Sequence, residues 1–230
     1  FPSYILNKNK WIDKVASQIK KRKPEIIINC SGNQNLKTSK KDLINILRSN
    51  LFSNIVFINQ ALEYKNFKGY ISFGTKWELG DSKIKRPLNF YAASKKANDV
   101  FFNFFSNKKS AIITLKVFDT YGKNDMRKKF LNDLLRSYKN NKFLNITGGK
   151  QYLDYININD LIKLISVIIE DIKKNKLKGF KSYTVSSKKP IRLINLIIKL
   201  KKILDKELKV KVGKIKYRQN ESKNPTKNIF

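Results

Sequence analysis

The sequence predicts an α/β fold in which a parallel sheet carries helices on both faces and is followed by a smaller C-terminal lobe. Short β-branched apolar runs alternate with longer segments whose apolar residues recur every three or four positions. Repeated helix-then-strand units with short connections are typical of a parallel sheet with crossover helices. The 230-residue length is enough for one such domain with a real core and one small lobe.

The first half of the chain contains three helix-then-strand units. The predicted helices lie at 12–23, 43–64 and 91–105, and the strands that follow them lie at 25–30, 69–74 and 111–117. The first strand is apolar on both faces, as expected of a buried parallel strand, and Cys30 at its end is predicted to be a buried small hydrophobe. The small polar residues 31–34 then form a turn at the sheet edge where open α/β proteins bind ligands.

The second half has a looser rhythm after Gly122. Its predicted elements are a helix at 125–138, a strand at 143–147, an extended stretch at 151–158, a helix at 160–173, a strand at 183–186, a helix at 193–204 and a terminal segment at 210–218. Asn159 is expected to cap the helix at 160–173. We therefore divide the chain into residues 1–124, the sheet domain, and 125–230, mostly the lobe, with 151–186 returning in part to the sheet.

The charge of the chain is strongly positive, with 50 Lys and Arg against 17 Asp and Glu, a formal net charge of +33. Such a charge keeps a basic nucleic-acid-binding module open as an alternative. Against it, 43 of the basic residues are Lys and only seven are Arg, and the Lys residues are spread along the whole chain. Since Arg is the better bidentate reader of phosphate and guanine, no specific nucleic-acid partner is expected.

Other compositional features exclude several classes. With no His and one Cys, the chain has neither a disulfide framework nor a Cys- or His-based metal cluster, and no metal is expected. No stretch approaches the ~20 apolar residues of a membrane span, and no leader pattern is present. We therefore expect a cytoplasmic protein without a membrane partner, and the start at Phe1 rather than Met suggests a fragment.

Tyr91 and Lys95 are the most informative pair in the chain. They are four residues apart at the start of a predicted helix, so their side chains share one face. A nearby cation is expected to lower the pKa of a phenol and make it useful for proton transfer. Thr75 closes the strand before this helix, and its hydroxyl could bind the same carbonyl oxygen. The three residues suit hydride transfer beside a nicotinamide, although a Tyr-x-x-x-Lys pattern can also be a buried Tyr and a surface Lys.

Seven segments follow one another along nearly the whole chain in an order and spacing that are informative together. They are residues 24–32, Asn50, residues 74–80, the Tyr-x-x-Ser-Lys motif at 91–95, residues 116–122, residues 154–160 and the Tyr-Arg-x-x-Glu segment at 217–221. Each match alone is weak, but taken in order they resemble the extended short-chain dehydrogenases/reductases, the NAD-dependent epimerase/dehydratase family.

The resemblance implies a Rossmann domain with a small substrate lobe, so residues 1–124 would be a partial NAD(P)-binding domain. It implies NAD or NADP as the cofactor, a nucleotide sugar as the substrate and a homodimer as a candidate assembly. The implied catalytic residues are Tyr91 as acid/base, Lys95 on the nicotinamide ribose and Thr75 on the sugar oxygen. The implied cofactor-binding residues are Cys30, Ser31, Gly32, Asn50 and Lys95, and the implied substrate-binding residues are Thr75, Trp77 and Arg218, the last on the pyrophosphate.

The resemblance also narrows the reaction. Dehydratases of the family carry an acidic pair directly after the catalytic Ser/Thr, whereas Lys76 and Trp77 follow Thr75 here. This segment looks more like the 4-ketoreductases of CDP-linked dideoxysugars, the abequose/paratose synthase type. Reduction of a 4-keto-6-deoxy nucleotide sugar is therefore expected, with 4-epimerisation by the same residues as the alternative.

One departure from the family concerns the N-terminal region. None of the nine glycines forms the Gly-rich turn that follows the family's first strand. We therefore expect the sheet to lack its N-terminal strands, and we expect this polypeptide by itself to bind NAD(P) poorly.

Overall fold

The central sheet has four parallel strands in the order β1-β2-β3-β8. The computed structural model describes residues 10–81, 83, 85–106, 109–127, 129–204 and 207–217. The strands are β1 (Ile26–Asn29), β2 (Gly69–Thr75), β3 (Ala111–Val117) and β8 (Gly179–Val185). This sheet confirms the predicted α/β class with parallel strands.

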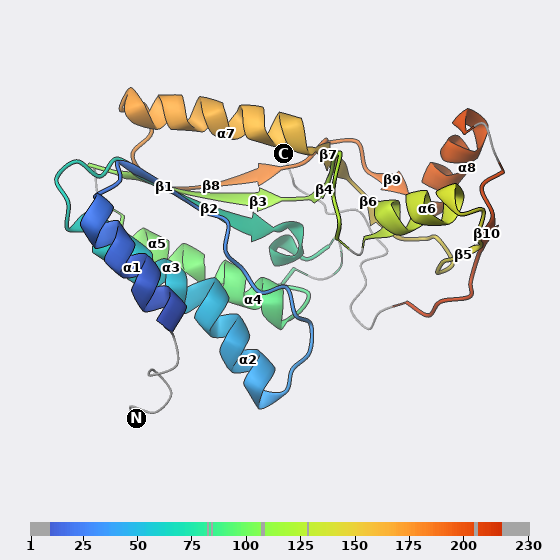
Figure 1. The fold of residues 1–230 in the computed structure, drawn as a ribbon, viewed down its shortest axis with the longest axis horizontal. Coiled ribbons are helices and arrows are strands. Elements are labelled where there is room, and N and C mark those ends of the chain that lie inside the picture. The colour runs from blue at the N-terminus through green and yellow to red at the C-terminus, as the bar shows by residue number, and fades with distance from the viewer. Residues whose placement is uncertain are drawn as a thin grey trace.

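Helices cover both faces of this sheet (Figure 1). On one face lies α7 (Ile158–Lys173), and on the other lie α1 (Lys10–Arg22), α3 (Ser53–Leu62) and α5 (Asn98–Phe104). Neighbouring residues of one strand serve opposite faces, because side chains alternate along a strand. Ile113 of β3 packs in the cluster with α7, whereas Ile112 packs in the cluster with α1 and α3.

Strand β1 is the edge of the described sheet, since its only strand partner among the described residues is β2. Ile28 in this strand is 41% exposed, although the apolar pattern predicted a buried strand. Cys30, just beyond the strand, is also exposed, so the prediction that it is a buried hydrophobe is wrong. The physical reason is that an apolar strand is buried on all sides only when a neighbour covers each edge.

The long helix predicted at 43–64 is divided by a π-helical turn. It consists of α2 (Lys40–Leu47), the turn η2 (Arg48–Phe52) and α3. The helix predicted at 91–105 is likewise two helices, α4 (Phe90–Lys96) and α5. Single π turns are frequent at functional sites because they free backbone carbonyls for other partners.

Several predicted boundaries in the second half differ from the structure. The helix predicted from residue 125 begins at Phe130 (α6, Phe130–Lys139), because Asp125 and Arg127 bond to one another in a turn. Helix α7 is capped by Asn157, whose Oδ1 accepts the Asn159 N–H, rather than by Asn159 itself. The strand predicted at 183–186 begins earlier, at the start of β8.

A third apolar cluster lies apart from the two that cover the sheet. Its buried residues come from α6, the segment around β5 (Leu144–Asn145), helix α8 (Leu193–Ile203) and the segment before β10 (Val210–Lys211). They are Leu134, Ile146, Leu193, Ile197 and Leu208. Two short strand pairs lie between this cluster and the sheet (Figure 1): β4 (Asp119–Tyr121) with β7 (Tyr155–Asn157), and β6 (Tyr152–Leu153) with β9 (Ile191–Arg192). Within the described part of the chain, no helix has the length and apolarity that crossing a bilayer would require.

A buried polar network anchors the end of β1 to strand β2 and helix α3. The Tyr70 hydroxyl donates to Asn54 Oδ1 at 2.7 Å and accepts from Asn29 Nδ2 at 2.8 Å. Asn29 also donates to Asn54 Oδ1 at 2.9 Å, and its own Oδ1 accepts the Ser31 N–H at 3.0 Å. Burial raises the pKa of Tyr70 well above its ordinary value, so its hydroxyl stays protonated. This network therefore fixes the start of the turn that follows β1.

The substitution Tyr70→Phe is expected to lower the free energy of unfolding by about 1–3 kcal/mol, because it removes two buried hydrogen bonds, one to Asn54 Oδ1 and one from Asn29 Nδ2. Urea denaturation measures the loss. Tyr183→Phe, at a 37% exposed position on β8, is the matched control and should change stability by less than about 0.5 kcal/mol. Equal effects of the two substitutions would contradict the role given to the network.

Candidate active site

Helix α4 presents both Tyr91 and Lys95 from one side. Asn89 begins the helix, because its side chain accepts the Ala92 N–H at 2.8 Å. Tyr91 is 7% exposed and Lys95 is 5% exposed, so both are buried rather than one being a surface lysine. Asn98, at the start of α5, donates to the carbonyls of Ser94 and Lys95 and thereby fixes the end of α4.

The ammonium group of Lys95 lies at the turn that follows β1. Its Nζ donates to the Ser31 carbonyl at 3.4 Å. A Cβ added at Gly32 would lie 3.2 Å from Nζ and 3.4 Å from Asn50 Oδ1, so the lysine occupies the space that a side chain would take. Burial lowers the pKa of Lys95 to about 8, while the charges of Glu78 and Cys30 oppose that change. The structure thus brings together Lys95, Ser31 and Gly32, three of the predicted cofactor-binding residues.

Asn50 links this turn to α4 from the centre of the π-helical turn. It is fully buried, and its Nδ2 donates to the Asn33 carbonyl and to Ser94 Oγ, both at 3.0 Å. Its Oδ1 accepts the Asn33 N–H at 2.7 Å. Its own carbonyl accepts from the side chains of Asn54 and Asn98. Through its side chain and its backbone carbonyl, Asn50 therefore fixes the turn after β1 relative to α3, α4 and α5.

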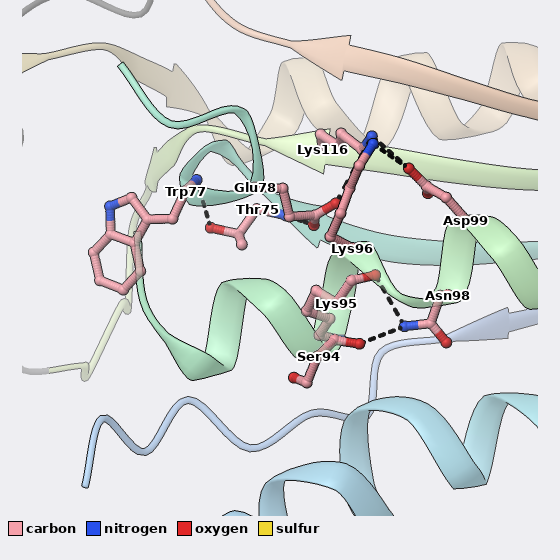
Figure 2. Close-up of polar contacts among 9 residues, drawn as sticks. All are labelled: Thr75, Trp77, Glu78, Ser94, Lys95, Lys96, Asn98, Asp99 and Lys116. Atoms are coloured by element: carbon pink, nitrogen blue, oxygen red, sulfur yellow. Dashed lines mark hydrogen bonds and ion pairs between the residues drawn. The ribbon is translucent and has the colours of Figure 1, made fainter. Parts of the chain in front are cut away.

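The segment after β2 brings Thr75 and Trp77 to the same edge of the sheet. Thr75 caps the short 3-10 helix η3 (Lys76–Leu79): its Oγ1 accepts the Trp77 N–H, and its own N–H donates to Glu78 Oε1 at 2.7 Å. The Trp77 ring meets the Tyr91 ring edge to face, with centroids 6.2 Å apart. Figure 2 shows Thr75 and Trp77 on this segment, opposite Ser94 and Lys95 on α4.

The phenol of Tyr91 differs electrostatically from what the sequence predicts. Burial raises its pKa to about 12, the negative charge of Glu78 adds to that rise, and a side-chain hydrogen bond with Gln34 opposes it. The expected lowering of the Tyr91 pKa is therefore wrong for this structure, because the loss of water around the phenol disfavours the phenolate. At neutral pH the side chain of Tyr91 is therefore a protonated phenol rather than a phenolate.

Several contacts at this edge were not predicted from the sequence. Asn33 and Gln34 contact the site through hydrogen bonds that join distant segments, which no local pattern reveals. Lys76 pairs with Asp119 at the start of β4, a partner that follows the next strand. Glu78 was readable, because Thr-x-x-Glu is the signature of a capping box.

The substrate side of the site is described only in part. Arg218, the predicted pyrophosphate contact, lies outside the described residues. The preceding residue, Tyr217, accepts the Lys150 N–H at its hydroxyl at 3.1 Å. A Cβ at Gly148 would lie 2.9 Å from the same hydroxyl, so the 148–150 turn closes tightly on this tyrosine.

The substitution Asn50→Ala is expected to cost about 2 kcal/mol of stability and to increase hydrogen exchange at the Asn33 amide, which loses its acceptor. Urea denaturation and amide exchange by NMR measure the two effects. Asn45→Ala, at an exposed position on α2, is the control and should leave the Asn33 amide protected. Unchanged protection in Asn50→Ala would refute the linking role.

Known proteins share both the sequence pattern and the fold. The sequence profile of the NAD dependent epimerase/dehydratase family matches residues 7–181. CDP-abequose synthase of Yersinia pseudotuberculosis is 27% identical over 150 residues, which are 64% of this chain and 51% of that protein. Protein CapI of Staphylococcus aureus is 22% identical over 208 residues, 80% of this chain and 62% of that protein. The chain thus spans about half to three-fifths of the length of these two curated relatives.

Solved structures of nucleotide-sugar epimerases superpose on most of the chain. UDP-glucuronic acid 4-epimerase from Bacillus cereus, in complex with UDP-glucuronic acid and NAD, gives a TM-score of 0.77 at 20% identity, covering 98% of this chain and 71% of that one. UDP-N-acetylglucosamine 4-epimerase from Methanobrevibacter ruminantium gives 0.74 at 15% identity, covering 96% and 71%. These likenesses establish the fold, and the profile match over most of the chain establishes the family. The chain belongs to the NAD-dependent epimerase/dehydratase family.

Proposed function

We propose that the protein carrying this sequence is an NAD(P)-dependent oxidoreductase that reduces a 4-keto-6-deoxy nucleotide sugar. The observation that carries the proposal is a convergence at one edge of the sheet. There Tyr91 contacts Trp77, two residues from Thr75, while Lys95 contacts the Ser31–Gly32 turn. This edge is formed by the carboxyl ends of parallel strands, where open α/β proteins bind their ligands.

The turn after β1 fits a cofactor. Ser31 Oγ is buried and has no hydrogen-bond partner among the described residues, so it is available to a ligand hydroxyl or phosphate. Gly32 leaves the space beside Lys95 without a side chain. We propose that Ser31, Gly32 and Lys95 hold NAD or NADP, with Cys30 beside them and Asn50 fixing the turn. The bound nicotinamide would supply the hydride for reduction.

The proton for the reduction is assigned to Tyr91. Because its pKa is about 12, the phenol is protonated at neutral pH and can donate to the sugar oxygen as that oxygen gains negative charge. Thr75 would donate its hydroxyl hydrogen to the same oxygen and orient it. A positive charge on Lys95 would stabilise the phenolate that Tyr91 becomes when it donates its proton.

The lobe is proposed to bind the nucleotide. We assign residues 1–124 to the cofactor domain and most of 125–230 to the substrate lobe, with the pyrophosphate on Arg218. The separate apolar cluster of α6 and α8 supports this division, since a lobe needs a core of its own. Strand β8 is part of the sheet and helix α7 packs against it, which supports the partial return of 151–186 to the cofactor domain.

One observation disfavours elimination, and a second favours reduction over 4-epimerisation. Lys76 is paired with Asp119, so the position after Thr75 holds no free acid of the kind that elimination needs. The protonated Tyr91 suits the reductive half-reaction, whereas an epimerase must also remove a proton from the alcohol. The 4-epimerases among the structural neighbours keep epimerisation as the second candidate.

In the complete protein, Tyr91→Phe is expected to lower the rate of NAD(P)H oxidation with a 4-keto-6-deoxy nucleotide sugar by about 10²–10⁴-fold, because the general acid is lost. Absorbance at 340 nm measures the rate, and fluorescence titration should show cofactor binding within a few fold of wild type. Tyr183→Phe is the control and should keep full activity. Turnover unchanged in Tyr91→Phe would refute the role of the phenol, and sugar interconversion without net NAD(P)H loss would establish the epimerase.

A homodimer is proposed from exposed apolar residues on helices that share one face of the sheet. On α2, η2 and α5 the side chains exposed by more than a third are Leu47, Phe52, Val100, Phe101 and Phe104, of which Phe104 is 79% exposed. Large exposed apolar side chains are one mark of an interface. A second copy of the chain is the proposed occupant.

The dimer is tested by light scattering after size exclusion. The wild-type protein is expected to have twice the monomer mass, and Phe104→Ser should shift the equilibrium towards monomer by removing a large apolar contact. Ile203→Ser on α8, where the side chain is 75% exposed, is the control and should leave the mass unchanged. A wild-type monomer at tens of micromolar concentration would refute the proposal.

A further inference from the structure

A buried ion cluster lies behind Thr75, and the proposed reaction does not use it. Glu78 is 4% exposed, and its Oε2 lies 3.8 Å from the Nζ of Lys116, itself 5% exposed on β3. Lys116 also pairs with Asp99 at 2.9 Å, and Asp99 pairs with Lys96 at 2.8 Å. Figure 2 shows the cluster between the 3-10 helix that Thr75 caps and the junction of α4 with α5.

The backbone around Glu78 is shaped to receive its carboxylate. Oε1 accepts the Thr75 N–H at 2.7 Å, so the acid closes the capping box from inside. A Cβ added at Gly74 would lie 2.5 Å from this Oε1 and 3.0 Å from Lys116 Cγ, so a side chain at that position would displace the carboxylate. The position of Thr75 therefore depends on a buried acid that only a glycine neighbour admits.

The charge of this acid is incompletely neutralised. Oε2 of Glu78 and Oδ1 of Asp99 are buried and have no hydrogen-bond partner in the described part of the chain. Burial raises the pKa of Glu78 to about 7, against the Thr75 N–H and the charge of Lys116. Glu78 and Lys95 are both buried, and Figure 2 shows Glu78 on the segment that faces α4. The negative charge of Glu78 accordingly opposes the lowering of the Lys95 pKa and adds to the rise of the Tyr91 pKa. The charged or titratable groups around Glu78 are Tyr91, Lys95 and Lys96 on α4, Asp99 on α5, Lys116 on β3 and, around Lys95, Cys30 after β1.

We infer that Glu78 is a positioning residue with two separable roles: its hydrogen bond holds Thr75 in place, and its buried negative charge keeps Lys95 protonated. Only the catalytic consequence of this inference rests on the proposed function. An ammonium buried without a compensating charge would lose its proton near neutral pH. A neutral Lys95 would no longer stabilise a phenolate on Tyr91.

Three variants separate the two roles. Glu78→Gln keeps the size and the acceptor oxygen but removes the charge. Glu78→Asp keeps the charge on a shorter side chain. Glu78→Ala removes both. Glu170→Gln is the matched control, because the side chain of this glutamate on α7 is 55% exposed.

The first experiment titrates Lys95 in the complete protein without substrate or cofactor. Lysine labelled with ¹³C at Cε is followed by NMR, and the Lys95 signal is assigned by its loss in Lys95→Met. The apparent pKa is expected near 8 in the wild type and in Glu170→Gln. In Glu78→Gln it should fall by about half a unit or more, and in Glu78→Asp it should stay close to wild type. An unchanged Lys95 titration in Glu78→Gln would overturn the charge role.

The second experiment measures hydrogen exchange at the Thr75 amide. Protection should persist in Glu78→Gln and be lost in Glu78→Ala, and full protection in Glu78→Ala would overturn the hydrogen-bond role. If Glu78→Ala does not fold, the Glu78→Gln and Glu78→Asp comparison still decides the charge role. Because neither readout uses a sugar or NAD(P)H, both remain valid if the proposed reduction fails. If reduction is observed, the alkaline limb of kcat should move in Glu78→Gln by the same number of pH units as the Lys95 titration.

Discussion

The ammonium of Lys95 is a charge held out of water, and the arrangement around it follows from the need to compensate it. A buried lysine keeps its proton only where carbonyls and negative charge replace the lost water. Ser31 supplies a carbonyl, Gly32 leaves room, and Glu78 supplies the charge. Ser31 and Gly32 follow β1 and Glu78 follows β2, so Lys95 on α4 lies where the ends of these two strands meet the helix.

Polar networks, rather than apolar contacts, hold this edge of the sheet together. Asn50 joins the turn after β1 to α4, and the network of Asn29 and Tyr70 joins the same turn to α3. Hydrogen bonds between buried groups are directional, so they fix positions more tightly than packing of similar strength does. The π-helical turn contributes because it presents the Asn50 carbonyl to two side chains at once. Precise placement of Lys95 and Tyr91 is the result.

The sequence predicted what depends on local pattern and failed where distant groups decide. The alternation of helices and strands in the first half and the placement of Tyr91 and Lys95 on one helix depend on spacing alone. The exposure of Cys30 depends on whether a neighbour covers the edge of β1, which one strand cannot reveal. The pKa of Tyr91 depends on burial by other segments, so the simple rule of a nearby cation gave the wrong direction. The capping box of Glu78 was visible, but its partner Lys116 comes from another strand.

Buried acidic residues are unexpected in a chain with so large an excess of positive charge. With 17 acidic residues against 50 basic ones, there are too few carboxylates to give each basic residue a partner of its own. Yet Glu78, Asp81 and Asp154 are each less than 9% exposed. Burying an acid costs free energy, and an exposed acid would instead reduce the positive charge of the surface. A drift of composition towards lysine acts on exposed positions, where the choice of side chain matters little to stability. This drift does not explain a buried carboxylate that lies against Gly74 and accepts the Thr75 N–H. We therefore attribute the acid at position 78 to its role in the site rather than to the composition of the surface.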